Sequence, residues 1–116
     1  MRSLLVTLVG AAVIATSAVA VHAQDAAKVA AGQKVYAAQK CSTCHQIKGA
    51  GNKAHPLDGV GAKLSEADMK KWFTNTAEME AKLPKKPAMS MAAFMKSKKL
   101  SDADVDALTA YMMSLK

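Results

Sequence analysis

Residues 41–45 read CSTCH, two cysteines separated by two residues and followed directly by a histidine. This Cys-x-x-Cys-His pattern is the attachment signal of c-type haem, in which both thiols form thioethers with the haem vinyl groups and the histidine binds the iron. The spacing suits that chemistry because Cys41 and Cys44 lie about one helical turn apart. The motif therefore predicts one covalently attached haem c, with Cys41, Cys44 and His45 as its binding residues.

Three other uses of such a cysteine pair compete with haem attachment. A disulfide between Cys41 and Cys44 is possible in an oxidising compartment, whereas a dithiol redox motif would require a βαβ context that this sequence lacks. A zinc site would require two further ligands, and His55 is the one additional candidate. Haem attachment is the leading interpretation, and the other three stay as alternatives.

The N-terminal segment has the pattern of a secretory signal peptide. Arg2 precedes an uncharged run over residues 3–21, and small or aliphatic residues stand before Gln24, where signal peptidase would cut. A retained anchor is the alternative, since about 18 apolar residues span a bilayer, but Ala, Gly, Ser and Thr interrupt the run. We expect a cleaved signal peptide over residues 1–23, a mature domain over residues 24–116, a periplasmic location and no stable membrane insertion.

The mature chain is small and basic. Removing residues 1–23 from the 116 leaves 93 residues, which form one domain with a modest core. Five aromatic residues are available to fill that core, so a covalently attached macrocycle would supply the missing apolar bulk. The 15 lysines and 9 acidic residues give a formal charge of +6, and no arginine is present. This surplus favours an acidic protein partner over nucleic acid, for which arginine and interleaved aromatic residues would be expected.

Apolar periodicity and capping patterns predict a helical chain. Residues 25–40 have helical spacing, and a short helix is expected over residues 76–81. LSEADM at 64–69 and LSDADV at 100–105 share one capping pattern. In each, the serine side chain can accept a bond from the first turn of a helix, and the aspartate three residues later can accept a bond from the serine backbone N–H. Residues 48–63 are rich in glycine and predict an irregular loop. No stretch alternates as a strand would, so the fold class is all-α.

The sequence resembles the small class I cytochromes c of bacteria over nearly all of residues 26–116. The likeness rests on CSTCH, on HPLDGVGAKLS at 55–65, on MAAF at 91–94 and on LSDADVDALTAYMMSL at 100–115. The resemblance implies three core helices plus short helical segments around one covalently attached haem, with the first and last helices crossing. It also implies a soluble, monohaem protein with a histidine and a methionine on the iron.

The resemblance assigns roles to residues outside CSTCH. Gly32 and Tyr36 would lie where the first helix crosses the last, with Leu108 and Tyr111 opposite them. The carbonyl of Pro56 would accept the N–H of the proximal imidazole, a bond that fixes the orientation of the ring.

Trp72 and His55 carry weaker signals. The indole N–H of Trp72 would reach a haem propionate, with core packing as the alternative. His55 stands before Pro56, where the family often has glycine. We expect His55 to be a surface or loop-packing residue rather than a rival iron ligand, because the proline would hold this loop on the proximal side.

The mature chain offers seven methionines as the distal iron ligand. A thioether on the iron favours the ferrous state and so raises the reduction potential. Met69 and Met112 match the apolar stripes of their helices and are expected in the core. Met79 falls in a charged turn, and Met113 is expected on the outer flank of the last helix.

The best distal candidates lie in the segment after the last proline. Met91 stands three residues before Phe94, which matches the family's Met-Pro-Ala-Phe arrangement with Ala92 in place of the proline. Without that proline the segment can continue as helix through Phe94 and Met95. We predict Met91 as the distal ligand, Met89 as the alternative and Met95 as a packing residue.

The resemblance implies a periplasmic one-electron carrier and not an enzyme. It would shuttle electrons, as a monomer, between a dehydrogenase or membrane complex and a terminal acceptor. Lysines on both sides of the predicted distal segment would form a positive lysine collar for transient contact with acidic redox proteins, with a merely solvated surface as the alternative: Lys82, Lys85, Lys86, Lys96, Lys98 and Lys99. Two other functions stay open, a haem enzyme or gas-binding cytochrome with an open distal site, and a dedicated cytochrome subunit of a larger redox enzyme.

Overall fold

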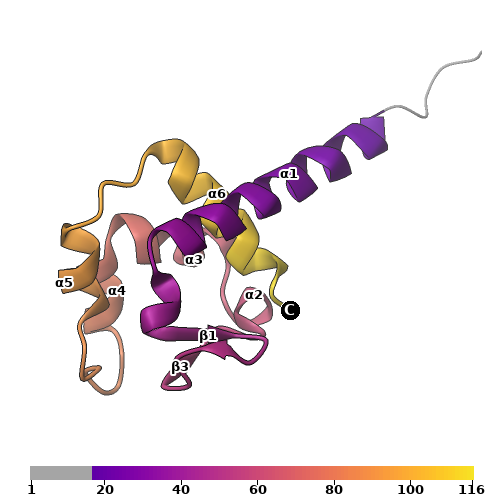
Figure 1. Ribbon diagram of the computed structural model, residues 1–116. Helices are drawn as coiled ribbons and strands as arrows, with labels where there is room; N and C mark the ends of the chain where they lie inside the picture. Colours follow the sequence, from indigo (N-terminus) through magenta and orange to yellow (C-terminus); the bar gives the residue numbers. More distant parts are fainter. Residues whose placement is uncertain (1–16) are drawn as a thin grey trace, which may run out of the picture.

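The computed structural model describes residues 17–116, and its backbone is mostly helical (Figure 1). Three longer helices form the frame: α1 (Ser17–Ala38), α3 (Glu66–Thr74) and α6 (Asp102–Ser114). Short helical segments connect them: the 3-10 turn η1 (Cys41–Thr43), α2 (Val60–Lys63), α4 (Thr76–Ala81) and α5 (Met91–Lys96). The predicted all-α class, with three core helices and additional short segments, is confirmed.

The predicted signal peptide lies largely outside the described residues, which begin at residue 17. The predicted cleavage point before Gln24 falls within α1. Between residues 17 and 116, no helix combines the length and the apolar character needed to cross a bilayer. Cleavage of residues 1–23 stays a prediction.

Helices α1 and α6 cross at close range, as predicted (Figure 1). Gly32 permits the approach, because a β-carbon at this position would collide with the carbonyl oxygen of Ala107 and the β-carbon of Tyr111. The rings of Tyr36 and Tyr111 pack edge to face with their centroids 5.8 Å apart, a favourable aromatic geometry. Leu108, also expected at this crossing, is buried and lines the cavity of the candidate site.

Both predicted serine caps form, and the pair of reciprocal bonds is complete at α6. There the Ser101 hydroxyl accepts from the Asp104 N–H at 3.1 Å, and the Asp104 carboxylate accepts from the Ser101 N–H at 3.2 Å. At α3 the Ser65 hydroxyl accepts from the Asp68 N–H at 3.2 Å. These bonds satisfy backbone donors that the first turn of a helix leaves without partners. They explain why α3 and α6 begin where the sequence predicts.

A small sheet follows the CSTCH turn, and the sequence did not predict it. Its strands are β1 (His45–Ile47), β2 (Ala50–Gly51) and β3 (His55–Pro56), with β1 in the middle, antiparallel to β2 and parallel to β3. Strands of two or three residues are too short to show an alternating pattern. The parallel register pairs His45 with His55, so the sheet brings the two histidines together.

The buried core is small and rich in methionine. Its fully buried cluster consists of Ile47, Met69, Met112 and Leu115, and Met69 and Met112 are each 3% exposed. The predicted packing role of these two methionines is confirmed. Met79, expected in a charged turn, is instead a buried residue of α4, because one face of this short helix packs against its neighbours.

Candidate functional site

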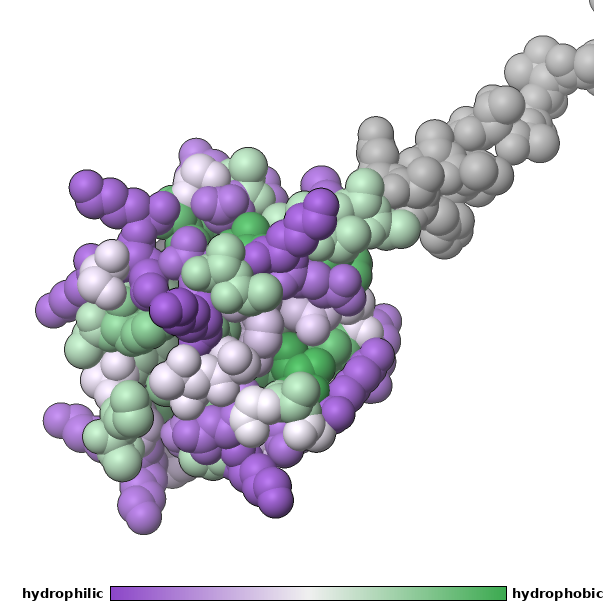
Figure 2. All heavy atoms as spheres, viewed as in Figure 1, coloured by the Kyte–Doolittle hydropathy of each residue, from purple (hydrophilic) through white to green (hydrophobic). Residues whose placement is uncertain are grey.

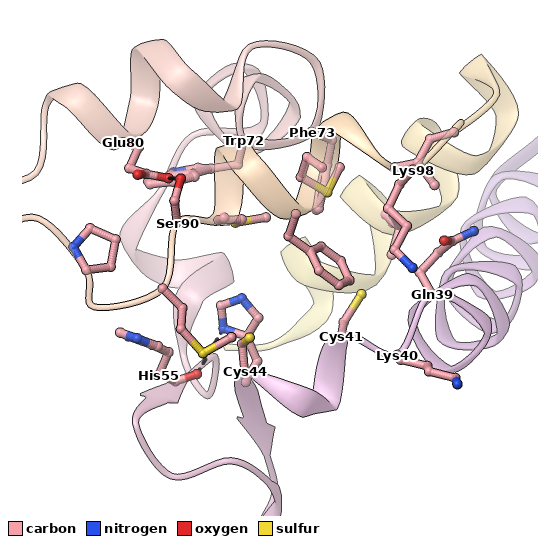
Figure 3. Close-up of a pocket in the computed structure, with 18 of the residues that line it drawn as sticks. Gln39, Lys40, Cys41, Cys44, His55, Trp72, Phe73, Glu80, Ser90 and Lys98 are labelled. Atoms are coloured by element: carbon pink, nitrogen blue, oxygen red, sulfur yellow. Dashed lines mark hydrogen bonds between the residues drawn. The ribbon is translucent and has the colours of Figure 1, made fainter.

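One cavity of about 270 Å³ opens beside the CSTCH turn (Figure 3). Cys41 and Cys44 line one side, and Trp72 and Phe73 of α3 line the opposite side. The segment between α4 and α5 and the first residues of α5, including Met91, complete the wall. The cavity therefore collects residues that are up to 69 positions apart (Gln39 to Leu108) around one chiefly apolar space.

The turn η1 places both cysteines on the cavity. It is closed by a bond from the Cys44 N–H to the Cys41 carbonyl at 3.2 Å, and Lys40 before it adopts a left-handed conformation with φ 57°. Both thiols are free and half-buried. Burial raises the pKa of the Cys41 thiol, and the nearby positive charge of Lys98 opposes that rise. Both sulfurs are thus available to one ligand in the cavity.

The imidazole of His45 is held in one tautomer. Its Nδ1 lies 3.0 Å from the carbonyl oxygen of His55. Because a carbonyl oxygen only accepts, Nδ1 carries the proton, and the lone pair of Nε2 is free to bind a metal. Burial lowers the pKa of His45, although the bond to the His55 carbonyl opposes the effect. The neutral ring, which is the metal-binding form, is therefore favoured.

The carbonyl partner of His45 differs from the prediction. The predicted acceptor was the carbonyl of Pro56, but the observed acceptor is the carbonyl of the preceding residue, His55. The strand register explains the difference, because β1 and β3 pair His45 with His55 and Gln46 with Pro56. Pro56 is exposed and lies outside the cavity lining. Its ring still restricts the backbone next to the accepting carbonyl.

His55 lies beside His45 rather than across the cavity from it. Its ring meets the ring of His45 edge to face, with centroids 6.1 Å apart, and its side chain is exposed. This position agrees with the expectation of a surface residue in the loop next to His45.

Both predicted distal candidates line the cavity. Met91 is the first residue of α5 and is half-buried, whereas Met89 is 65% exposed. Helix α5 continues through Phe94 and Met95, as expected when alanine replaces the proline. Met95 also lines the cavity. The half-buried thioether of Met91 is better shielded from water than that of Met89.

The residues around this cavity fit a covalently bound haem. Two thiols stand in the spacing that forms two thioethers, and a neutral imidazole with a free Nε2 follows them. Thioether sulfur is a further ligand type for iron, and the side chains of Met89, Met91 and Met95 line the same cavity. Apolar side chains, among them Phe73, Leu100 and Leu108, provide walls for a flat apolar macrocycle.

Comparison with known protein families agrees with this chemistry. A family model described as Cytochrome c matches residues 29–116. The chain belongs to the cytochrome c family. The protein accordingly carries covalently bound haem c with its iron, acts as an electron carrier, and has the class I fold. Comparisons with curated proteins and with solved structures find no match.

Trp72 lies on the α3 side of this cytochrome c cavity (Figure 3). It is half-buried, and its backbone carbonyl accepts a bond from the Thr76 hydroxyl at 2.8 Å. That bond joins the end of α3 to the start of α4. The indole contact with a haem propionate stays a prediction.

Glu80 was not predicted to have a role in the cytochrome c cavity, and Lys98 was predicted only as a member of the lysine collar. Glu80, at the end of α4, lines the cavity and accepts bonds from Ser90 and Ala92. Lys98 lies over the ring of Phe94, with its Nζ 4.6 Å from the ring centroid. The partners of Glu80 are 10 and 12 residues away, so local sequence patterns could not have revealed those bonds. Lys98 and Phe94 are four residues apart, and this helical spacing is the signal that could have revealed their contact.

Proposed function

We propose that this cytochrome c is a periplasmic, monohaem carrier of single electrons with one histidine and one methionine on the iron. In this proposal Cys41 and Cys44 hold the haem, His45 is the proximal ligand and Met91 is the distal ligand. The observation that supports it most directly is one apolar cavity lined by both cysteines, by a neutral His45 with free Nε2 and by Met91. With both His45 and Met91 bound, the iron would have no open position for a substrate, which favours electron transfer over catalysis.

The residues of the chain orient the iron ligands and shield the haem site from water in both redox states. The His55 carbonyl fixes the ring of His45 and increases its basicity as a ligand. The thioether of Met91 favours the reduced state, and the apolar wall limits the access of water. The bound haem supplies the iron that gains and loses the electron. Because the ligands are held by helices and a strand, the chain needs little rearrangement between the two redox states.

The assignment of Met91 is tested by the weak long-wavelength charge-transfer band of an iron–sulfur bond. Met91→Ala is expected to abolish this band, whereas Met89→Ala is the matched control and is expected to keep it. Loss of the band in Met89→Ala together with its retention in Met91→Ala would transfer the distal role to Met89.

Carbon monoxide distinguishes a closed carrier from a haem enzyme or gas-binding cytochrome. A methionine bound tightly to ferrous iron resists displacement, so we expect the reduced protein to bind carbon monoxide slowly and weakly. Rapid binding would favour an open distal site. Size-exclusion chromatography of the native material separates a free monomeric carrier from a subunit of a larger redox enzyme.

The proposed partners are acidic redox proteins that bind briefly at the lysine collar, between a donating dehydrogenase or membrane complex and a terminal acceptor. Five of its six lysines are exposed, and Lys98 also lines the cavity. On the face seen in Figure 2, hydrophilic side chains project around the body with more hydrophobic surface between them. Positive charge around an opening to the haem would guide an acidic surface towards it.

The periplasmic location depends on the proposed cleavage of residues 1–23. Family members are usually secreted or face the outside of the cell. Intact-mass measurement of the protein from a periplasmic extract should give a chain that begins at Gln24 and carries one haem. A full-length chain in the membrane fraction would contradict both the cleavage and the location.

A further inference from the structure

Glu80 connects the end of α4 to the segment that carries Met91 (Figure 3). Its Oε2 accepts a bond from the Ala92 N–H at 2.9 Å and another from the Ser90 hydroxyl at 3.1 Å. Ser90 and Ala92 are the two neighbours of Met91 in the chain. One carboxylate oxygen therefore binds the chain on both sides of this methionine, through the Ser90 side chain and the Ala92 backbone.

Ser90 extends the connection into α5. Its hydroxyl donates to Glu80 and accepts from the Ala93 N–H at 3.1 Å, which makes Ser90 the N-cap of the helix. Glu80 and Ser90 together satisfy the N–H groups of Ala92 and Ala93 in the first turn, where backbone donors have no helical partners. The bonds from the Ala92 N–H and the Ser90 hydroxyl lower the pKa of Glu80, in agreement with a carboxylate that is ionised in this contact.

The bond to Ala92 depends on the residue type at that position. Alanine has a backbone N–H, whereas a proline would have none. A proline would instead restrict the backbone through its ring. In this chain the restriction is supplied from outside the segment, by a side chain on the neighbouring helix α4.

We infer that Glu80 is a positioning residue that keeps the thioether of Met91 directed at the iron. This inference rests on the proposed role of Met91 as the distal ligand. Glu80 does not itself contact the iron. It acts by holding Ser90 and Ala92, so that Met91 returns to the iron quickly after a momentary dissociation and competes well with other ligands.

The test compares three variants of the holoprotein for the binding of imidazole to ferric iron, which displaces the methionine. Glu80→Ala removes both bonds and the charge, Glu80→Gln removes the charge and keeps an oxygen that can accept both bonds, and Glu78→Ala is the control. Glu78 lies on the same helix, carries the same charge and bonds at the surface to Lys82 and Asn75.

We expect Glu80→Ala to increase the imidazole affinity about tenfold, as the loss of bonds to a charged group predicts. Glu80→Gln should increase it less than about threefold, and Glu78→Ala should leave it unchanged. Hydrogen exchange at the Ala92 amide should accelerate in Glu80→Ala and little in Glu80→Gln. An unchanged affinity in Glu80→Ala, or equal increases in Glu80→Ala and Glu80→Gln, would overturn the inference.

Two further variants keep the test decisive. If Glu80→Ala does not fold, Ser90→Ala removes one of the two bonds and should raise the imidazole affinity by a smaller factor; no rise there would count against the inference. Met91→Ala separates the two proposals. Retention of the iron–sulfur band in Met91→Ala refutes the ligand assignment and this inference with it, whereas loss of the band there with normal imidazole affinity in Glu80→Ala refutes the role of Glu80 alone.

Discussion

At the scale of single residues, His45 and Tyr36 differ in whether a buried N–H or O–H group has a hydrogen-bond partner. The His55 carbonyl decides which nitrogen of His45 holds the proton, and no side-chain substitution at residue 55 removes that acceptor. Tyr36 shows the opposite situation. Its hydroxyl is buried and, within residues 17–116, has no hydrogen-bond partner. A buried hydroxyl without a partner is a cost to the folded state.

Tyr36→Phe should therefore stabilise the protein by about 1 kcal/mol near neutral pH. Burial is the main cause that raises the pKa of Tyr36 to about 12. A raised pKa means that the folded state favours the protonated hydroxyl. The ionisation of Tyr36 therefore does not affect the free energy of unfolding below the ordinary pKa of about 10. As the pH rises from about 10 to about 12, the unfolded chain ionises first and the free energy of unfolding falls.

Thermal melts of the two proteins between pH 7 and pH 12 check both statements. The melting temperature of the native chain should fall more steeply above pH 10 than that of Tyr36→Phe. Tyr111→Phe is the matched control, because it removes the hydroxyl from the other ring of the same aromatic pair. Parallel melting curves for the native chain and Tyr36→Phe would contradict the prediction.

At the scale of secondary-structure elements, the sequence predicts features that depend on residues close together in the chain. The serine caps give the starts of α3 and α6, and Gly32 marks the crossing of α1 with α6. The antiparallel pair of β1 and β2 is local, but its strands are too short to show an alternating pattern. The parallel pairing of β1 with β3 and the bond from the Ala92 N–H to Glu80 join residues that are 10 and 12 positions apart, so no local pattern predicts them. For the same reason the acceptor for His45 was predicted one residue too late, at Pro56.

The two capped helices allow a comparison within one protein. Ser101→Ala and Ser65→Ala each remove one bond to a serine hydroxyl, so we expect each to lower the free energy of unfolding by about 1 kcal/mol. The return bond at α6 uses the backbone N–H of residue 101 and is lost only when the Asp104 carboxylate is removed. Asp104→Ala should therefore cost more than Asp68→Ala, because Asp68 accepts no such bond at α3. Denaturant titrations of these variants provide the measurement, and equal losses in Asp104→Ala and Asp68→Ala would show that the return bond contributes nothing.

At the scale of the whole molecule, the fold depends on the cofactor because the protein supplies little core of its own. The fully buried cluster has four members, while Leu108, the most deeply buried side chain, faces the cavity together with Phe73 and Leu100. Without haem these side chains would surround a space open to water. The small number of aromatic residues in the chain indicates the same dependence, which stays a prediction.

Cys41→Ala combined with Cys44→Ala should give a chain that lacks haem and stable helical structure. The lost apolar contacts around a cavity of about 270 Å³ exceed what a small domain can tolerate. Circular dichroism during heating is the measurement, and Ser42→Ala with Thr43→Ala is the control that keeps both thiols. A cooperative melt of the double cysteine variant, with native helical content, would show that the polypeptide folds without its cofactor.

The distribution of charge yields the last prediction, which concerns how the whole molecule meets its partners. If the lysine collar guides negatively charged molecules to the haem, Lys85→Glu with Lys86→Glu should slow oxidation of the ferrous protein by an anionic iron hexacyanide about tenfold at low salt. Lys34→Glu with Lys63→Glu makes the same change of net charge on α1 and α2, which do not line the cavity, and should have a smaller effect.

Stopped-flow rates at increasing ionic strength test the mechanism behind that difference. Salt at about 0.15 M screens exposed charges beyond roughly 8 Å, so the rates of the native chain and the collar variant should converge as salt is added. A cationic oxidant should show the reverse order, with the collar variant reacting faster at low salt. If Lys34→Glu with Lys63→Glu slows the anionic reaction as much as the collar variant does, then net charge, and not the position of the collar, controls the encounter.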